Sequence, residues 1–178
     1  MQKRRAHLRF IGISAMVAAC MCILSPITLP MGAIPITLSV LALFLVASLA
    51  PTRVVMTATA VYLALGAVGL PVFSAFTGGV FAFLSPSGGF LWGYLPVVFV
   101  VSVFAQKGRG RLGIVAVGLA AGLVLLYAFG LFGFCVLTGA DVWEGFLLAV
   151  LPFLLPDALK LCLVLILYQA LAKRFFRN

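Results

Sequence analysis

Six long apolar runs, separated by short segments rich in proline, glycine or basic residues, most constrain what this chain can fold into. A helix needs about 20 mostly apolar residues to cross the hydrocarbon core of a bilayer. The 178 residues are 65% hydrophobic and 8% charged, whereas about a quarter of a typical soluble domain is charged. The sequence therefore predicts an all-α integral membrane protein, a single transmembrane domain over residues 1–178. The six expected spans are Phe10–Leu24, Ile36–Ala50, Val54–Leu70, Phe90–Ala105, Leu112–Leu131 and Asp157–Ala172.

All but one of the twelve positive charges lie at the ends of the chain or in alternate connections. They form the clusters Lys3, Arg4, Arg5 and Arg9; Arg53; Lys107, Arg109 and Arg111; and Lys173, Arg174 and Arg177. Basic connections usually face the cytoplasm, so the pattern predicts six spans with both termini cytoplasmic. Although the net charge is +9, nucleic acid is not an expected partner, because a nucleic-acid protein presents its cations on one continuous face.

The connections on the outer side are expected to be long and irregular. They are Ser25–Pro35, Pro71–Gly89 and Phe132–Pro156, and the last contains Asp141 and Glu144 but no basic residue. The second span, of about 15 residues, would measure about 22 Å, less than the roughly 30 Å of a hydrocarbon core. Irregular backbone at membrane depth must be buried or line a cavity. We therefore expect these connections to dip inward and cap a site that opens outward.

The beginning of the chain has an alternative interpretation. A basic start, an apolar stretch and Val17-Ala18-Ala19-Cys20 together resemble a bacterial lipoprotein signal and, loosely, a secretory signal peptide. Cleavage there would leave an odd number of spans for a cytoplasmic C-terminus. It would also remove Ala15 and Ala19, which lie four residues apart and form a close-packing helix face of the small-xxx-small kind. We therefore favour a retained first span.

Residues for catalysis or metal binding are not evident in the sequence. His7 is the sole histidine and lies in the basic N-terminal tail, and no phosphate-binding GxxxxGK[ST] motif occurs. The four cysteines, at positions 20, 22, 135 and 162, lack metal-site spacing and imply no disulfide framework. A small membrane enzyme acting on lipid is accordingly a weaker alternative than a binding protein, and neither a metal nor a cofactor is expected.

Asp157 and Lys160 are the exceptional charges, because both fall inside an apolar run. Pro156 suits a first helical turn, so we expect the last helix to begin at Asp157, whose carboxylate would complement the positive end of the helix dipole. The spacing of three places Asp157 and Lys160 on one face. A charge facing lipid at mid-helix costs about 2.5 to 3.5 kcal/mol, so both should face the interior, either as structural partners or, as we favour, as a ligand site.

Polar and aromatic residues of the outer segments are expected at the same level as this pair. Hydroxyl groups at alternate positions open the second span, glycines that let backbone approach a ligand precede the fourth, and aromatic rings can wall an apolar ligand. Each feature taken singly suits packing or turn formation; their combination favours a pocket. The candidate ligand-binding residues are Asp157, Lys160, Thr37, Ser39, Phe73, Ser87, Gly88, Gly89, Phe90 and Tyr94.

Four motifs in this order resemble the BioY family, the biotin-specific S components of energy-coupling factor (ECF) transporters, over nearly the whole chain. The motifs are Ile34-Pro35-Ile36-Thr37-Leu38, Leu65-Gly66-Ala67-Val68-Gly69-Leu70-Pro71-Val72-Phe73, Ser85-Pro86-Ser87-Gly88-Gly89-Phe90 and Leu155-Pro156-Asp157-Ala158-Leu159-Lys160.

The resemblance implies a function and a set of partners. It implies a prokaryotic plasma- or inner-membrane S component, not itself an enzyme, that captures biotin from outside, with Asp157 and Lys160 in the site. It also implies that Ala15 and Ala19 dock on a transmembrane coupling subunit driven by two ATPase subunits. This chain has Ser39, Ser87 and Phe90 where the family usually has Gln, Thr and Tyr. An S component for another vitamin, such as thiamin or riboflavin, is therefore an alternative.

Overall fold

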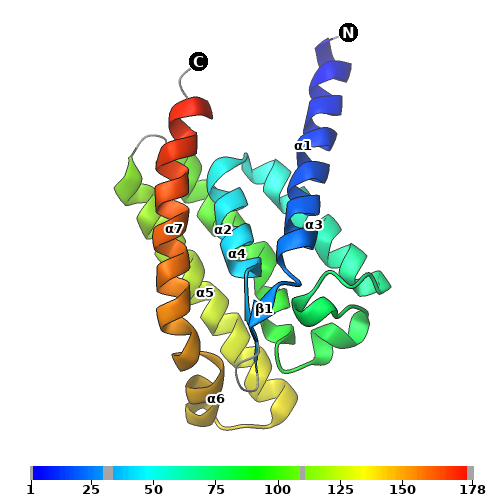
Figure 1. The fold of residues 1–178 in the computed structure, drawn as a ribbon, viewed down its shortest axis with the longest axis vertical. Helices are drawn as coiled ribbons and strands as arrows, with labels where there is room; N and C mark the ends of the chain where they lie inside the picture. The colour runs from blue at the N-terminus through cyan, green and yellow to red at the C-terminus, as the bar shows by residue number, and fades with distance from the viewer. Residues whose placement is uncertain (1, 30–33, 109–110, 176–178) are drawn as a thin grey trace.

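The computed structural model describes residues 2–29, 34–108 and 111–175, and nearly all of this chain is helical. Both termini lie at one end of an elongated helical bundle, and the short helix α6 lies at the other (Figure 1). The elements in order are α1 (Gln2–Leu24), β1 (Thr28–Leu29), β2 (Ile36–Thr37), α2 (Ser39–Leu49), α3 (Thr52–Val68), the 3-10 turns η1 (Ser74–Phe76) and η2 (Val80–Leu84), α4 (Gly88–Lys107), α5 (Leu112–Thr138), α6 (Val142–Ala149) and α7 (Leu151–Phe175).

Each of the six predicted spans contains a helix, and four of the described helices are long and apolar enough to cross a membrane. These four are α1, α4, α5 and α7, while α2 and α3 are shorter apolar helices. The helices also carry large apolar side chains on their exposed faces, such as Val68, Val124 and Leu155, which are 85%, 70% and 74% exposed. Water would disfavour such a surface, whereas lipid matches it. The fold is therefore that of a membrane protein.

The interior is formed by helices from both halves of the chain. Val55 of α3, Val98 of α4 and Leu119 of α5 are completely buried in the largest apolar cluster. Helices α4 and α5 pack along much of their lengths, because glycines on each let the backbones approach. A Cβ on Gly89 would lie 2.7 Å from the Cα of Gly133, closer than real Cβ atoms come. This close α4–α5 contact positions the residues that α4 presents to the interior.

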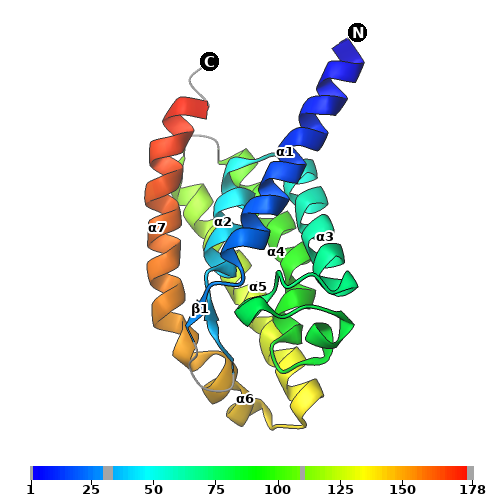
Figure 2. The same cartoon turned by 45° about the vertical axis from the view of Figure 1, so that its right-hand side comes forward.

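The second span begins later than predicted. Ile36 and Thr37 belong to β2, which pairs in antiparallel fashion with β1 in the register Thr28 to Thr37 and Leu29 to Ile36. Alternating apolar and hydroxyl residues suit a strand, and Pro35 disfavours helical backbone before it. Helix α2 therefore begins at Ser39 and is only about 16 Å long at 1.5 Å per residue. The β1–β2 hairpin continues the bundle beyond it, as Figure 2 shows.

The third predicted outer connection, Phe132–Pro156, is largely helical, which corrects the expectation of an irregular loop. Helix α5 continues to Thr138 and is terminated by Gly139 in a left-handed conformation with φ of 74°. Helix α6 then begins after Asp141, whose carboxylate accepts a hydrogen bond from the backbone N–H of Trp143 at 3.3 Å. With Glu144 in the first turn, this start has the composition of a capping box.

The last helix begins at Leu151, so the prediction that it starts at Asp157 is wrong. Pro152 occupies the first turn, where a missing N–H costs nothing, and Pro156 lies inside the helix. Asp157 consequently lies in the second turn. The helix dipole acts mainly within the first turn, so it stabilises the Asp157 carboxylate less than expected. Hydrogen bonds from other side chains stabilise it instead.

The predicted cytoplasmic clusters lie toward the end that carries the termini. Arg4, Arg5 and Arg9 are on the first turns of α1, which begins at Gln2 and not at Phe10, and Arg53 is on the first turn of α3. Arg109 and Arg177 lie outside the described residues. The predicted connection Pro71–Gly89 is irregular apart from η1, η2 and its last two residues, which begin α4.

Candidate functional site

Asp157 and Lys160 form a buried ion pair on the inner face of α7. The spacing of three residues places both on one side of the helix, and the Lys160 Nζ donates to Asp157 Oδ1 at 2.7 Å. Their side chains are 3% and 11% exposed. Removing charges from water costs several kcal/mol per ion, which mutual attraction offsets only when the remaining polar atoms also have partners. The second carboxylate oxygen of Asp157 therefore also needs a hydrogen-bond partner.

Tyr127 supplies that second partner, and sequence reasoning missed it. Its hydroxyl, on α5, donates to Asp157 Oδ2 at 2.9 Å. Both carboxylate oxygens of Asp157 are thus bonded, by Lys160 from the same helix and by Tyr127 from a neighbouring one. One weak signal existed in the sequence, a lone tyrosine within the apolar run Leu112–Leu131. The arrangement holds the pair in one orientation and joins α5 to α7.

Hydroxyl groups from three elements form a second polar group. Tyr94 of α4 donates to Ser39 Oγ at 2.9 Å, and Ser39, at the start of α2, also shares a short hydrogen bond with Thr37 of β2. Ser39 and Tyr94 are buried, and Thr37 is half-buried. The late start of α2 is what allows this arrangement, since Thr37 leaves the helix and faces Ser39. These oxygens can accept or donate hydrogen bonds to a ligand.

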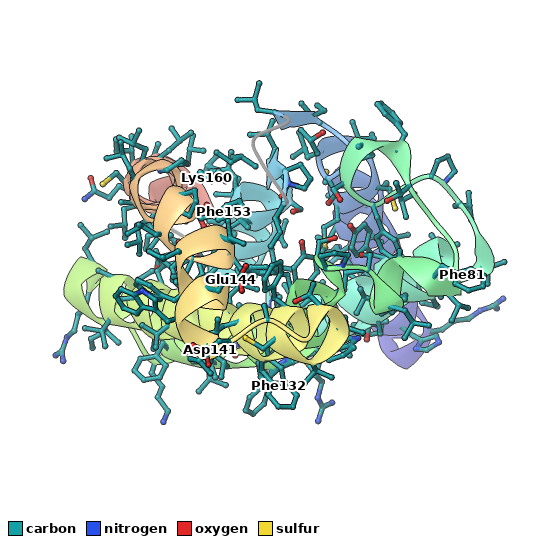
Figure 3. All side chains as sticks on the ribbon, turned by 90° about the horizontal axis from the view of Figure 1, so that it is seen from below. Phe81, Phe132, Asp141, Glu144, Phe153 and Lys160 are labelled. Carbon is teal, nitrogen blue, oxygen red and sulfur yellow. The ribbon has the colours of Figure 1, made fainter. Side chains whose placement is uncertain are left out.

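Aromatic rings cover the apolar side of the same region. Phe73 packs edge-on against Tyr62, with ring centroids 5.5 Å apart and planes at 81°, and edge-on against Phe83 at 5.5 Å. Phe90 and Phe153, from α4 and α7, have centroids 6.3 Å apart. Viewed from the α6 end, Phe153 and Lys160 project from the same side of α7, and Phe81 lies on the far side of the molecule (Figure 3). Edge-on aromatic pairs are rigid and suit the wall of a small-molecule site.

These groups surround one pocket. It has about 60 Å³ of space for the centre of a water-sized molecule and is partly open to the surroundings. Eight of the ten candidate ligand-binding residues line it: Thr37, Ser39, Phe73, Ser87, Phe90, Tyr94, Asp157 and Lys160. The other lining residues are Ile34, Pro35, Val40, Tyr62, Ser74, Thr77, Ala82, Leu91, Leu126 and Phe153. Residues from β2, α2, α3, α4, α5 and α7 therefore meet at one place.

Gly88 and Gly89, the other two candidates, lie outside this lining at the first turn of α4. A Cβ on Gly88 would lie 2.2 Å from the carbonyl oxygen of Phe83, and one on Gly89 would lie 2.6 Å from that of Phe129. Both glycines thus permit close backbone packing, Gly88 against η2 and Gly89 against α5. Their structural effect is to set the position of Phe90, the next residue.

Ala15 and Ala19 lie on the exposed face of α1, away from the pocket. Their helix buries Ser14, Val17 and Ala18 on its other face. The two alanines therefore present a flat strip to the surroundings of the bundle. Such a strip permits close approach of a second helix.

The pocket suits a small ligand with an apolar body and polar groups at separate points. Its lining offers a carboxylate and an ammonium group, several hydroxyls, and aromatic rings. The ion pair is net neutral, so it can accept from a ligand N–H at Asp157 and donate to a ligand carbonyl or carboxylate at Lys160. The arrangement is one for binding and orientation.

A family model and two relatives of similar sequence point to the same family. The family model described as the BioY family matches residues 1–177. A protein named biotin transporter BioY from Thermotoga maritima is 35% identical over 149 residues, covering 83% of this chain and 86% of that protein. Biotin transporter BioY2 from Lactococcus lactis subsp. cremoris is 31% identical, covering 89% of this chain and 87% of that protein.

The fold also has a solved counterpart. A crystal structure described as the S-component for biotin from an ECF-type ABC transporter superposes with a TM-score of 0.80, covering 98% of this chain and 94% of that one at 22% identity. At this identity the match speaks for the fold alone. The resemblance found in the four sequence motifs is thereby confirmed by both sequence and fold.

Proposed function

Because this chain belongs to the BioY family, we propose that it is the substrate-binding S component of an ATP-driven vitamin uptake transporter, with biotin as its ligand. The observation that carries the proposal is the buried Asp157–Lys160 pair, 2.7 Å apart, inside a pocket of rings and hydroxyls. Relatives named biotin transporters support the choice of ligand. The chain's part is binding, and it has no ATP-hydrolysing phosphate loop of its own.

The chemistry of biotin matches this pocket. Its fused rings are mostly apolar and fit between Phe73, Phe90 and Phe153. Its ureido group offers two N–H donors and a carbonyl, and its valerate tail ends in a carboxylate. Asp157, Lys160 and the Thr37–Ser39 hydroxyls supply complementary acceptors and donors. Ser87, Tyr94 and the close-packed Gly88 and Gly89 complete the proposed site.

We further propose a six-helix transmembrane bundle in a prokaryotic plasma or inner membrane, with both termini in the cytoplasm. The charge distribution supports this orientation, because Arg5, Arg9 and Arg53 share the end that carries the termini, and Asp141 and Glu144 lie at the opposite end. The pocket would then open toward the outside, beneath the β1–β2 hairpin. Residues 1–178 would form a single domain.

The partners we propose are a transmembrane coupling subunit and two ATPase subunits, with docking through Ala15 and Ala19. Bulky residues at both positions, as in A15W/A19W, should prevent assembly and uptake while leaving biotin binding to the isolated chain intact. Co-purification with the coupling subunit and titration with biotin measure the two effects. Loss of biotin binding in this variant, or unchanged assembly, would overturn the docking assignment.

A panel of vitamins tests the ligand. The purified full chain in detergent is saturated with labelled biotin, and unlabelled biotin, thiamin or riboflavin is then added. Only unlabelled biotin should displace the label. Displacement by thiamin or riboflavin at similar concentrations would instead favour the alternative that Ser39, Ser87 and Phe90 raise, an S component for another vitamin.

A further inference from the structure

A second groove lies at the end of the bundle that carries the termini, far from the pocket with Asp157. It is formed by the first turns of α1, the start of α3 and the last turns of α4. Figure 2 shows α1 reaching past the neighbouring helices at this end. The residues that line the groove are Arg5, Ala6, Arg9, Phe10, Ile13, Pro51, Thr52, Arg53, Val54, Val103 and Gln106.

Three arginines line this groove and have no acidic partner from the described residues. The chain has three acidic residues, Asp141, Glu144 and Asp157. Asp157 is bonded to Lys160 and Tyr127, and the other two lie at α6, at the opposite end of the bundle. Three guanidinium groups lining one groove repel one another, and an anion between them would relieve that repulsion. No acidic side chain of the described residues supplies such an anion.

The polar floor of the groove is held in place by hydrogen bonds between α3 and α4. The Gln106 side-chain amide donates to the Thr52 hydroxyl in a short bond, and Ser102 Oγ lies 3.0 Å from the same hydroxyl. These bonds fix the start of α3, and with it Arg53, against α4. The groove is thus a defined surface between three helices.

The groove changes from cationic to apolar in the direction of the membrane. Arg5 lies on the outermost turns of α1, and Phe10 and Ile13 lie about 7.5 Å and about 12 Å farther along the helix at 1.5 Å per residue, with Arg9 directly before Phe10. Val54 and Val103 extend the apolar part on the facing helices. A ligand that fits has an anionic head group and an apolar body directed toward the middle of the bilayer.

We propose that this groove binds the phosphate head group of an anionic phospholipid, with its acyl chains against the apolar part. The proposed orientation places this lipid in the cytoplasmic leaflet. Arginine forms forked hydrogen bonds to phosphate, and basic pockets between transmembrane helices are suited to anionic head groups. An acidic protein segment fits less well, because the groove continues into apolar surface at membrane depth. The single negative charge of the bound phosphate would reduce the repulsion among Arg5, Arg9 and Arg53 and hold α1 against α3.

The test measures lipid binding to the purified full chain in neutral detergent, by native mass spectrometry during titration. The probes are dioleoyl phosphatidylglycerol, dioleoyl phosphatidylcholine and inorganic phosphate. Phosphatidylglycerol should bind more tightly than phosphatidylcholine. The variant R9Q/R53Q should bind phosphatidylglycerol about 30-fold more weakly, since each basic residue contributes a factor of about five. Unchanged biotin binding by this variant shows that it is folded.

The matched control is K107Q/R111Q, which removes two exposed cations from the same end of the bundle but outside the groove. Its affinity for phosphatidylglycerol should equal that of the wild type. Three results would overturn the proposal: equal binding of the two lipids, an equal loss in the control variant, or displacement of phosphatidylglycerol by an equal concentration of inorganic phosphate. The proposal would also be overturned if the R9Q/R53Q variant kept its affinity for phosphatidylglycerol and instead failed to assemble with the coupling subunit.

Discussion

Replacing Lys160 by methionine tests whether the stability of the protein depends on each charge of the buried ion pair having its partner. Methionine keeps much of the apolar stem and removes the ammonium group, which leaves Asp157 Oδ1 without its partner at 2.7 Å. Removing one member of a buried pair costs about 3 to 5 kcal/mol. Since Lys160 is 11% exposed, the lower value of about 3 kcal/mol applies. For a chain of this size this corresponds to a fall of about 6 to 12 °C in the thermal midpoint.

The second variant in this test removes both charges. In D157N/K160M the new amide oxygen still accepts from Tyr127, and no buried charge is left unpaired. Neutral replacement of a buried pair is often without cost or stabilising. Thermal unfolding in detergent without biotin, followed by tryptophan fluorescence, should place the double variant near the wild type and the single variant well below it. A double variant as unstable as the single one, or a single variant as stable as the wild type, would refute the reasoning.

Two further predictions concern packing and hydrogen bonding near the pocket. Tyr127→Phe should lower the free energy of unfolding by about 1 to 2 kcal/mol, because it removes a hydrogen bond to Asp157. Tyr168→Phe is the control and should not lower it, because the buried Tyr168 hydroxyl has no partner within the described chain. Thermal unfolding compares the two variants. Gly89→Ala should cost about 1 to 3 kcal/mol by forcing α4 from α5, and Gly12→Ala, where a new Cβ meets nothing within 4 Å, should leave the midpoint unchanged or higher. Equal shifts within either pair would contradict the packing assignments.

The helical spans were the most predictable part of the fold, because a lipid environment requires long apolar runs and satisfied backbone. Their ends were less predictable. The start of α7 lies at the first of two prolines. Pro152 and Pro156 both suit a first turn, and only the burial of Phe153, which is 7% exposed and which the sequence does not show, distinguishes them. Helix α6 had a local signal, Asp141 followed by Glu144 at capping-box spacing, but its eight residues are too few to read as a span.

The residues of the candidate site also differ in how far the sequence predicts them. Asp157 and Lys160 were predictable, because charges are rare in apolar runs and must face the interior. Thr37 and Ser39 were predicted from their spacing, but their mutual hydrogen bond depends on the strand that ends at Thr37, a consequence of tertiary pairing with Thr28. Tyr127 was missed because its partner lies 30 residues away in sequence, and one tyrosine in an apolar helix usually indicates packing.

The most direct test of the account is an equilibrium titration of biotin into the purified wild-type chain in detergent, with Lys160→Ala measured beside it. The account predicts saturable one-site binding with Kd below about 1 μM. It also predicts clearly weaker binding by the variant, which should retain its helical circular dichroism. A folded wild-type chain without saturable binding in that range would contradict the proposed function, and equal affinities would make the Asp157–Lys160 pair structural only.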